Sequence, residues 1–421
     1  MFRPFALLAA ALLSIAAAAQ DAGAARRLAI FDQVWSQVGA HYYDPRMNGV
    51  DWAAARARHR PAAAAAPDDH TLHLVLRAML GELRDAHTRL LSPDQARDRR
   101  RQRTTSAGVV LFEVEGRPTV FAVRPGSPAA AAGLTPGMAV LAVNGVPAAE
   151  AIARARAEVG PSSSDRAGLV LAWLRLIAGP PDEPLRLDLA NADGTAPRSV
   201  ALARVPLDAA PRFEARMLPS NILHVRFDTF RAPVARLFRA ALREHEGARG
   251  LILDLRSNTG GDGREGARMV APLLDGPTLI ARLATRTGRA PSALLGLVKL
   301  PLRLSAGEAG GRLFAGPVVI LVNQGTGSTS EVIAASLQER GRARVVGTRS
   351  CGCALGVLRY RRLATGGALA ISEIGLVSGL GRRIEGEGVV PDVPVELTLA
   401  DLAAGRDRVL EAAVQALEGA R

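Results

Sequence analysis

The sequence predicts a multidomain α+β protein with a helical N-terminal segment, a β-rich middle and a C-terminal α/β core. Three patterns support this prediction: apolar residues spaced three and four apart, then short strands between Gly/Pro turns, then apolar strands that lead into helices. The 421 residues exceed one ordinary domain, and a hydrophobic fraction of 48% with 22% charged residues excludes a wholly disordered chain. The predicted boundaries are 1–19 for a signal peptide, 20–103 for a helical domain, 104–205 for a β-rich domain, 206–398 for the core and 399–421 for a C-terminal helix.

Cysteine and lysine are scarce in this chain. Two cysteines cannot form a disulfide-stapled scaffold or a four-thiolate zinc site. The formal charge of +13 favours anionic partners, but Lys299 is the single lysine among 53 basic residues, and the arginines are scattered among alanines without interleaved aromatics. This pattern disfavours nucleic acid as a partner, and it leaves one candidate for any mechanism that needs a lysine.

The first residues indicate the compartment. Arg3 supplies a positive start, Phe5 to Ile15 is a short apolar run, and Ala17-Ala18-Ala19 is a small-residue cleavage site. The run is too short to span a bilayer comfortably, and no other stretch of about 18 apolar residues follows. We therefore expect a periplasmic or secreted protein without stable membrane insertion. In that compartment Cys351 and Cys353 can be oxidised, although a disulfide across one intervening residue would close a strained ring.

The segment from 27 to 92 is expected to be helical. Leu28, Phe31, Val34, Trp35 and Val38 recur at helical spacing, and a second run from Leu72 to Leu91 repeats the pattern. An Ala/Pro linker, Pro61 to Pro67, separates the two runs, and the Arg-rich segment Arg97 to Arg103 is expected to be a solvated hinge.

In the middle part, short strands surround one expected helix, Ala167 to Ala178. The turn Asn191-Ala192-Asp193-Gly194 predicts a hairpin between the two strands that flank it. The predicted strands are Thr119 to Val123, Ala139 to Val143, Leu185 to Leu189 and Ser199 to Ala203.

From residue 206 onward, strands and helices alternate. Buried apolar strands that feed helices through tight turns are typical of an α/β sheet, whose reactive groups gather at the carboxyl ends of the strands. The expected strands are Ile222 to Phe227, Leu251 to Leu255 and Val318 to Val322, and the helices that follow them are Val234 to Glu244, Arg264 to Leu274 and Ser328 to Arg340.

Ser328 is placed at the start of the last of these helices, in Gly327-Ser328-Thr329-Ser330-Glu331. One interpretation is a capping box, in which the serine accepts from the N–H of Glu331 and the Glu331 carboxylate reaches back. The other is a nucleophilic serine, because a helix start favours developing negative charge. On this segment alone the capping box is favoured.

The turn after the preceding strand, Asp254 to Gly261, presents exposed backbone N–H groups. It is either a plain glycine turn or part of a reactive site, and a phosphate loop is disfavoured because no Gly-Lys-Ser/Thr follows. If the two turns are neighbours in the sheet, the N–H of Gly260 or Gly261 and that of Thr329 can form an oxyanion hole.

Five short motifs follow one another along the chain. They are Asp85-Ala86-His87-Thr88, Arg124 to Ala129 with Ala132-Gly133-Leu134, Asp254 to Gly261, Gly327 to Glu331, and Gly388-Val389-Val390-Pro391-Asp392. In this order they resemble the C-terminal processing, or tail-specific, serine peptidases and their tricorn-like relatives. The resemblance implies a PDZ-type peptide-binding domain at 104–205, a crotonase/ClpP-like spiral core and cleavage of peptides near their C-termini. It also favours Ser328 as nucleophile, a role that one residue can combine with capping.

The chain departs from the processing peptidases at their general base, which is a lysine in a Phe-Gly-Lys-Gly motif. The corresponding position, 25 residues after Ser328, holds Cys353, and the family's glutamine four residues further on is replaced by Val357. Lys299 fits no family position and is expected to be a solvated helix lysine. A Ser/Lys pair is therefore disfavoured, and another group must take the proton or the enzyme is inactive. Cys351 and Cys353 are expected to form a wall of the pocket.

The tricorn-like branch implies a different base, a histidine in the N-terminal helical segment completed by a late glutamate. His87 matches that histidine, and Glu385 matches the glutamate. A histidine titrates near neutral pH, and a carboxylate can hold its tautomer. The serine that this branch carries before the histidine is replaced here by Ala86. His87 is therefore either the catalytic base or a structural histidine hydrogen-bonded between helices.

Two other clusters have weaker claims. His70 and His73, near Asp68 and Asp69, have a metal-like spacing, but a solvated helix start is favoured, and no metal or cofactor is predicted. Cys351-Gly352-Cys353 is also compatible with a redox-active or copper-binding pair, or with a cysteine nucleophile at position 353.

The combined prediction is an exported serine endopeptidase that cleaves peptides or unfolded proteins. Its PDZ-like domain is expected to bind a substrate's C-terminal end by strand addition, with Ser106-Ala107-Gly108-Val109 as the carboxylate clamp. The alternative is a catalytically inactive peptide- or lipid-binding protein that keeps the fold. The missing lysine favours this alternative, whereas His87 with Glu385 opposes it. The sequence leaves the natural substrate and the oligomeric state open.

Overall fold

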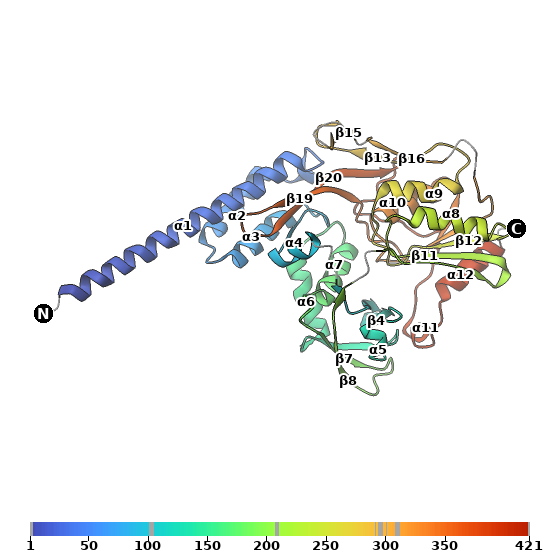
Figure 1. Cartoon of the computed structure of the whole chain (residues 1–421), viewed down its shortest axis with the longest axis horizontal. Helices are drawn as coiled ribbons and strands as arrows, with labels where there is room; N and C mark the ends of the chain where they lie inside the picture. The colour runs from blue at the N-terminus through green and yellow to red at the C-terminus, as the bar shows by residue number, and fades with distance from the viewer. Residues whose placement is uncertain are drawn as a thin grey trace.

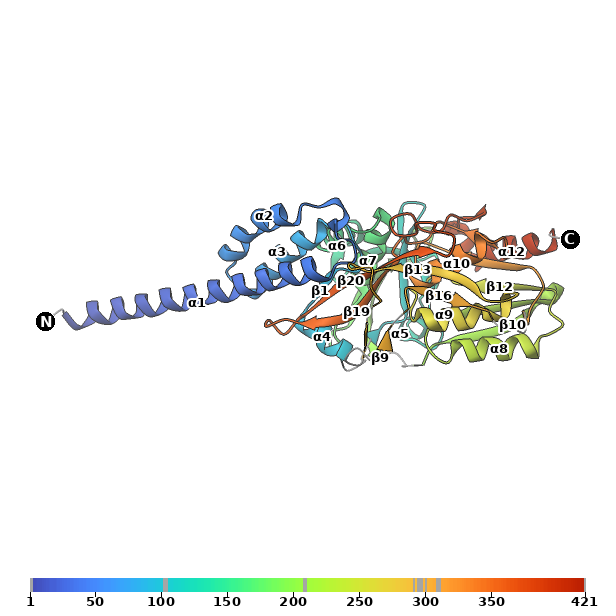
Figure 2. The same ribbon diagram turned by 90° about the horizontal axis from the view of Figure 1, so that it is seen from above.

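The computed structural model describes residues 3–100, 105–206, 210–290, 292–293, 298–299, 301–307 and 312–419. Within these ranges, side chains are described from residue 22 onward, except for residues 291–300. Its elements form an N-terminal helical part, a middle part around one antiparallel sheet, and a core around a mostly parallel sheet (Figure 1, Figure 2). The fold is therefore multidomain α+β, as the sequence predicts. The side chains of the predicted signal peptide, Met1 to Ala19, lie outside the description.

Three helices build the N-terminal part: α1 (Arg3–His41), α2 (Trp52–Ala65) and α3 (Asp69–Gly81). The apolar residues that recur at helical spacing meet in one buried cluster, which includes Phe31 from α1 and Leu72 from α3. The cluster also takes in Leu369 and Ile371 from a distant strand. The helices are therefore joined to the rest of the protein by shared core packing.

Three local predictions for this part are corrected by the structure. Pro61 lies inside α2, so the expected linker begins only at Ala66, which is extended because it precedes a proline. The second helical run ends at Gly81, and Arg89–Leu91 forms strand β1. The expected hinge is helical up to Arg100, within α4 (Pro93–Arg100), and its remaining residues, 101–103, lie outside the described chain.

Strand β1 pairs with β20 at one edge of an antiparallel sheet of order β1-β20-β13-β16, in which β19 also pairs with β20. A separate two-stranded pair, β14 (Ser292–Ala293) with β15 (Val298–Lys299), contains the single lysine. The prediction of a helical Lys299 is thus wrong, and its side chain lies outside the description. The bounds of the sheet's other strands are Thr278–Ala284 for β13, Arg303–Ala306 for β16, Leu355–Arg362 for β19 and Ala368–Ser378 for β20.

The middle part is an antiparallel sheet of order β3-β4-β5-β7-β8, and the four strands predicted for it are confirmed within one or two residues. Asn144 and Gly145 both have positive φ, as a tight hairpin turn requires. Strand β3 is an edge strand, and helix α7 lies against it. The bounds are β2 (Thr105–Ser106), β3 (Val109–Val114), β4 (Arg117–Val123), α5 (Pro128–Ala131), β5 (Ala139–Val143), β6 (Val146–Pro147), α6 (Ala148–Val159), α7 (Asp165–Ile177), β7 (Leu185–Ala190), β8 (Arg198–Leu202) and β9 (Val205–Pro206).

The core sheet has the order β10-β11-β12-β17-β18-β21, and all its strands except β10 run parallel. Strands β12 and β17 are buried along their whole length, as continuous apolar runs in a parallel sheet require. Helices α8, α9 and α10 cover one face, and α12 covers the other. The bounds are β10 (Phe213–Leu218), β11 (Ile222–Phe227), α8 (Val234–Glu244), β12 (Gly250–Asp254), α9 (Gly263–Val270), β17 (Val318–Val322), α10 (Thr329–Gln338), β18 (Ala343–Gly347), β21 (Val393–Pro394), α11 (Leu399–Ala403) and α12 (Arg408–Glu418).

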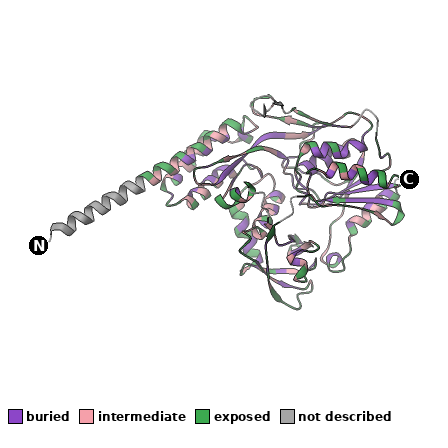
Figure 3. Cartoon of the chain, viewed as in Figure 1, coloured by how far each residue is buried: buried purple, intermediate pink, exposed green. Residues whose placement is uncertain are grey.

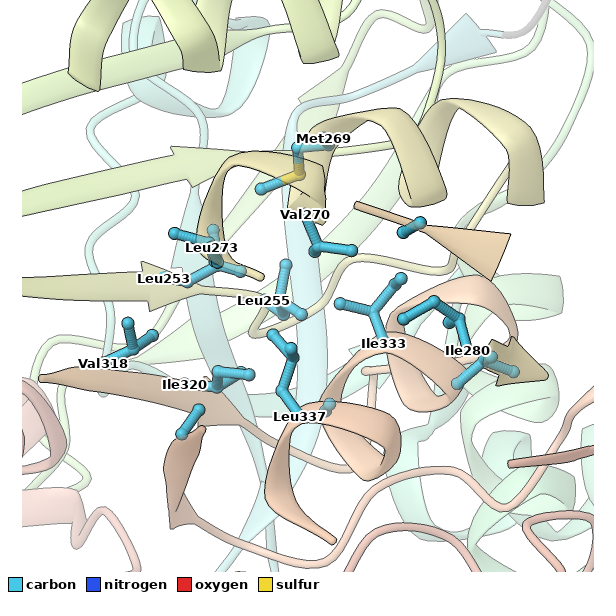
Figure 4. Close-up of a cluster of buried hydrophobic side chains, with 14 of the residues drawn as sticks. Leu253, Leu255, Met269, Val270, Leu273, Ile280, Val318, Ile320, Ile333 and Leu337 are labelled. Carbon is cyan, nitrogen blue, oxygen red and sulfur yellow. The ribbon is translucent and has the colours of Figure 1, made fainter. Parts of the chain in front are cut away.

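Burial is concentrated in the strands of this sheet and on the helix faces turned toward it (Figure 3). The close-up in Figure 4 shows side chains of β12, β17, α9 and α10 meeting in one apolar cluster. Because the cluster reaches the carboxyl ends of β12 and β17, it fixes the two turns that leave those strands. The labelled members include Leu253, Leu255, Met269, Val270, Val318, Ile320, Ile333 and Leu337.

Candidate active site

The two turns singled out in the sequence are neighbours. Strands β12 and β17 pair in parallel, with Asp254 opposite Leu321, so their carboxyl ends lie side by side. The N–H of Gly327 donates to the carbonyl of Asn258 at 3.0 Å, and a second bond joins the Thr326 hydroxyl to the carbonyl of Leu255 at 2.8 Å. The turn that carries Ser328 is therefore tied directly to the glycine-rich turn.

Asn258 is the central tie between these turns, and sequence reasoning gave it no role. It is fully buried, and its amide nitrogen donates to the carbonyl of Phe227 at 3.0 Å. Its side-chain oxygen accepts from the N–H of Gly260 at 3.0 Å and from the hydroxyl of Ser330 at 2.9 Å. The only sequence signal was its place in a turn after a buried strand.

Ser328 directly precedes α10, in an unusual backbone conformation. Its φ of 55° and ψ of −121° lie outside the regions that non-glycine residues ordinarily occupy. Its N–H donates to the carbonyl of Cys353 and to the carboxylate of Glu331, each at 3.0 Å, which is the carboxylate half of the predicted capping box. Strained, half-exposed residues at a strand-to-helix turn are concentrated at functional sites.

The hydrogen bonds around Ser328 reduce the number of backbone N–H groups that can form the predicted oxyanion hole. The N–H of Gly260 is already engaged by Asn258, which removes it from the set. In the described part of the chain, the N–H groups of Gly261 and Thr329 donate to no protein acceptor. The Thr329 hydroxyl donates to the carbonyl of Gly261 at 2.8 Å, so these two residues are held together.

Gly260 is required at its position for steric reasons, and its replacement gives a first prediction. A Cβ there would lie 2.7 Å from the Cβ of Ser328 and 2.8 Å from the nitrogen of Thr329, at a φ of +97°. We expect Gly260→Ala to displace the Ser328 turn and to lower peptide hydrolysis by roughly 100-fold or more. Steady-state kinetics and thermal unfolding measure the two effects together.

The matched control is Gly247→Ala, because a Cβ at that exposed glycine would meet nothing within 4 Å. Full activity in Gly260→Ala would contradict the close approach of the two turns.

Glu331 holds more partners than a capping residue needs. It is completely buried, and its carboxylate accepts from the Ser350 hydroxyl and from the N–H groups of Gly352 and Cys353, at 2.6 and 3.0 Å for the two amides. Burial raises its pKa, and these hydrogen bonds act in the opposite direction. Glu331 thus connects the start of α10 to the Cys351-Gly352-Cys353 segment, a role the sequence did not reveal.

Cys351 and Cys353 form a disulfide, with 5.4 Å between their Cα atoms. The pair lies against the Ser328 turn: a Cβ on Gly327 would be 3.1 Å from the sulfur of Cys353. The structure therefore brings the predicted pocket wall and Ser328 together. Since both sulfurs are bonded to each other, Cys353 has no free thiol to act as nucleophile or metal ligand in this state.

His87 follows α3, just before β1. Its N–H donates to the buried carboxylate of Asp85 at 2.7 Å, and the Thr88 hydroxyl donates to the same carboxylate. The Nδ1 atom of His87 is buried without a hydrogen-bond partner, and burial lowers the pKa of the ring while Asp85 acts in the opposite direction. Within the described chain, no hydrogen bond joins the ring to Ser328 or Glu385.

Glu385 lies close to the same carboxylate. One oxygen accepts from the N–H of Ala354 at 2.6 Å, and the other is buried without a hydrogen-bond partner. Burial, followed by the charge of Asp85, raises the pKa of Glu385 to about 8. Asp85 is therefore linked to both predicted residues, by a hydrogen bond from the backbone of His87 and by its charge to Glu385.

Ser163 stands beside the residue that replaces the tricorn-like serine. Its hydroxyl accepts from the N–H of Ala86 at 2.9 Å, and its interaction with Glu385 lowers the pKa of that carboxyl group. The next residue, Ser164, caps α7 and donates to the carbonyl of Cys351 at 2.7 Å. The sequence signal, a serine run before a helix, indicates the cap but not these contacts with other parts of the chain.

The predicted carboxylate clamp, Ser106 to Val109, lies at the start of edge strand β3. The Gly108 N–H donates to the Ser106 hydroxyl at 2.9 Å, and a Cβ on Gly108 would lie 2.1 Å from that of Ser127. The loop is therefore packed tightly against the start of α5, beside the open edge of β3 and α7.

The aspartates near the histidine pair on α3, His70 and His73, are engaged by other groups. Asp68 accepts from the N–H of Thr71 as the cap of α3, and Asp69 forms an ion pair with Arg26. Burial lowers the pKa of His73 to about 4. Among the described residues, no group of three His, Cys, Asp or Glu side chains could hold a metal ion.

A cavity of about 290 Å³ lies between the middle part and the core. Charged side chains line much of it, including Glu113, Arg166, Arg256 and Arg349. Apolar side chains, among them Val114, Phe121 and Val322, line much of the rest, so the wall of this cavity is mixed in polarity.

Comparison with known proteins gives matches among the peptidases. Residues 221–395 match the model of peptidase family S41, and residues 24–81 match that of the tricorn protease C1 domain. A carboxyl-terminal-processing protease of Synechocystis sp. is 27% identical over 402 residues, covering 92% of this chain and 86% of the relative. The putative tricorn protease homolog 2 of Streptomyces coelicolor is 28% identical over 416 residues, covering 91% of this chain and 32% of the relative.

Solved structures show the same fold. The photosystem II D1 C-terminal processing protease superposes with a TM-score of 0.60 at 24% identity, covering 93% of this chain and 97% of its own. Mature CPAF in complex with lactacystin superposes with a TM-score of 0.66 at 13% identity, also covering 93% of this chain and 97% of its own. The core of the chain is thus similar to the serine-type peptidases of family S41. Nearly the whole chain is similar to carboxyl-terminal-processing proteases and to part of the tricorn proteases.

In the described part of the chain, no helix combines the length and the apolar character needed to cross a bilayer.

Proposed function

We propose that this protein is an active serine endopeptidase that cleaves unfolded polypeptides near their C-termini, with Ser328 as nucleophile and His87 as general base. The observation that carries the proposal is the strained Ser328 turn, next to two backbone N–H groups that have no acceptor among the described residues. A nucleophile and preorganised donors for an oxyanion are the two parts that acyl transfer requires.

The proposed mechanism uses groups of this chain alone. His87 accepts the proton of the Ser328 hydroxyl as the oxygen attacks the scissile carbonyl, and the N–H groups of Gly261 and Thr329 stabilise the negative charge on the carbonyl oxygen. The N-terminus of α10 adds a favourable dipole. The protonated imidazole then gives its proton to the leaving amine, and water releases the acyl group by the reverse sequence.

His87 suits this role because its pKa is depressed. Because desolvation lowers its pKa below the ordinary value, the ring is neutral at pH 7, and the neutral form is the one that accepts a proton. Among the described residues its Nδ1 atom has no hydrogen-bond partner, so it is open to a new hydrogen bond. The neighbouring carboxylate of Asp85, whose charge acts on the ring against the effect of burial, can stabilise the imidazolium that forms.

We infer that the middle part, 104–205, is a PDZ-like domain that binds the substrate's C-terminal end. The open edge of β3 beside α7 supports strand addition, and in this proposal the loop Ser106 to Val109 receives the terminal carboxylate. The contact of Ser164 with the carbonyl of Cys351 supports delivery of the bound peptide to the Ser328 turn.

Paired peptide substrates test this function. Peptides with a free C-terminal carboxylate and their C-terminal amides are incubated with the full chain, and the products are mapped by mass spectrometry. We expect faster cleavage of the free acids. Equal rates would contradict the clamp, and no cleavage of any peptide or of an unfolded protein would favour the inactive binding protein.

We also propose that the protein is exported, on the strength of the Met1 to Ala19 sequence pattern. Fractionation of cells that express the full chain, with mass spectrometry of the mature N-terminus, tests this. Cleavage after Ala19 is expected, and an uncleaved cytoplasmic product would contradict export.

Glu385→Gln is predicted to have opposite effects on activity and stability. A carboxyl group whose folded pKa is about 8 binds its proton more tightly in the folded than in the unfolded state. The wild-type protein therefore loses stability as pH rises from about 4.3 to 8, and the neutral glutamine removes this loss. We expect a higher free energy of unfolding for the variant at pH 8, a difference that vanishes near pH 4, and a roughly 10- to 100-fold lower kcat.

Denaturant unfolding at several pH values, together with peptide hydrolysis, measures both effects. Glu387→Gln is the matched control, because Glu387 lies two residues away and its side chain forms no hydrogen bond among the described residues. A variant that is less stable than wild type at pH 8 would contradict a protonated, buried Glu385.

A further inference from the structure

The segment Cys351-Gly352-Cys353 lies beside Ser328 and is held by hydrogen bonds along its whole backbone. All of its backbone N–H and C=O groups are hydrogen-bonded, and their partners come from four different parts of the site. Movement of this segment would therefore disturb several of them together. The partners are the carbonyl of Thr326, the hydroxyl of Ser164, the two carboxylate oxygens of Glu331, the N–H of Gly386 and the N–H of Ser328.

The disulfide closes this segment on itself and also packs against the loop that carries His87. Ala86 and Ala167 form a buried apolar cluster with Cys351, and Cys353 packs against it. The disulfide thus lies between the Ser328 turn on one side and the residue before His87 on the other. It is the one covalent link in the described chain outside the backbone.

The two sulfur-bearing residues differ in access. Cys351 is 5% exposed, whereas Cys353 is half-buried and can be reached from solvent. Attack on a disulfide requires an in-line approach to one sulfur, so an incoming thiolate reaches Cys353 first.

We propose that the Cys351–Cys353 disulfide is a redox site that controls the geometry of the Ser328 turn, with the oxidised form active and the reduced form impaired. This inference deepens the proposed peptidase function and rests on it for its effect on activity. The reaction partner is a dithiol. One thiolate bonds to the sulfur of Cys353 and the sulfur of Cys351 leaves as a thiolate, then the second thiol of the reagent displaces Cys353 and becomes a disulfide. Two electrons pass to the protein, and each cysteine thiolate takes up a proton.

Reduction breaks the covalent bond between Cys351 and Cys353 but leaves both residues in the chain. The carbonyl of Cys353, which accepts from the N–H of Ser328, is then positioned by hydrogen bonds alone, and the contact with Ala86 loosens. Because small misplacements of reacting groups slow acyl transfer strongly, we expect a roughly 10- to 100-fold lower kcat in the reduced protein. Reoxidation should restore it.

The test compares the oxidised full chain with the same protein treated with dithiothreitol. Iodoacetamide and mass spectrometry count the thiols, and peptide hydrolysis is followed before reduction, after reduction and after reoxidation with diamide. The expected result is two alkylated thiols and a reversible loss of activity. The double variant Cys351→Ser/Cys353→Ser should start at the reduced level and ignore dithiothreitol. Unchanged activity with two alkylated thiols, or a double variant as active as the oxidised protein, would overturn the proposal.

A second measurement separates this proposal from the peptidase function. In Ser328→Ala, which lacks the nucleophile but keeps the disulfide, reduction is expected to raise amide hydrogen exchange in residues 323–337 and 85–91. If reduction raises exchange but neither the oxidised nor the reduced wild-type protein hydrolyses peptides, the redox proposal holds and the peptidase proposal is refuted. Unchanged exchange upon full reduction would overturn the redox proposal itself.

Discussion

Ser328→Ala is expected to lower the hydrolysis of an unfolded protein by at least about four orders of magnitude, because it removes the nucleophile on which every later step depends. The change deletes one oxygen and leaves the backbone bonds of the N–H to Cys353 and Glu331 in place. We therefore expect an unchanged fold, unchanged peptide binding and a Tm close to that of wild type. Steady-state kinetics with a denatured protein substrate, and thermal unfolding, measure these quantities.

The matched control for this variant is Ser305→Ala, an exposed serine on β16 that is expected to leave activity unaltered. Residual hydrolysis close to the wild-type rate in Ser328→Ala would show that another residue is the nucleophile.

His87→Ala is expected to cost several orders of magnitude in kcat while leaving peptide binding intact. An unperturbed serine hydroxyl is too weakly acidic to attack at neutral pH, so its activation needs a base. The only lysine lies in β15, whereas His87 is adjacent to Ala86, which packs on the disulfide beside the Ser328 turn. Kinetics and binding of a non-cleavable peptide, measured on the same preparation, separate loss of chemistry from loss of structure.

The pH dependence of kcat/KM gives His87 a second signature. The neutral imidazole is the active form, and burial holds the pKa of His87 below the ordinary value near 6.5. Activity should therefore rise with pH through a single step whose midpoint lies below 6.5, and that step should be absent from the residual activity of His87→Ala.

His70→Ala, at an exposed histidine on α3, is the matched control and should behave as wild type. A rise only at alkaline pH, or loss of activity in Lys299→Ala with retention in His87→Ala, would contradict the histidine assignment.

Local sequence patterns predicted most elements of the fold. The strands at 139–143, 222–227 and 318–322 and the helix at 234–244 lie at the predicted residues, because alternation and helical spacing report the burial that forms them. The failures occurred where burial by distant residues overrides local preference. Strand β1 forms only because β20, almost 280 residues later, pairs with it, and Pro61 is accommodated inside a helix that packs on its neighbours.

For the site, sequence motifs identified the residues at the two turns but not what holds them. Asn258, Glu331, Asp85 and Ser163 each act through partners far away along the chain, and no local pattern encodes such contacts. The hydrogen bond from the Gly260 N–H to the Asn258 side chain also could not be predicted from local sequence. Motif order was therefore enough to predict the family resemblance, whereas the supporting hydrogen bonds required the three-dimensional structure.

Covalent labelling of the full chain with a fluorophosphonate probe tests the central claim most directly, because the probe reacts only with an activated serine. The adduct is located by mass spectrometry of the peptide that contains Ser328. The account predicts one adduct, on Ser328, absent from Ser328→Ala and formed far more slowly in His87→Ala. No adduct on the folded, oxidised protein, or an adduct on a different residue, would contradict it.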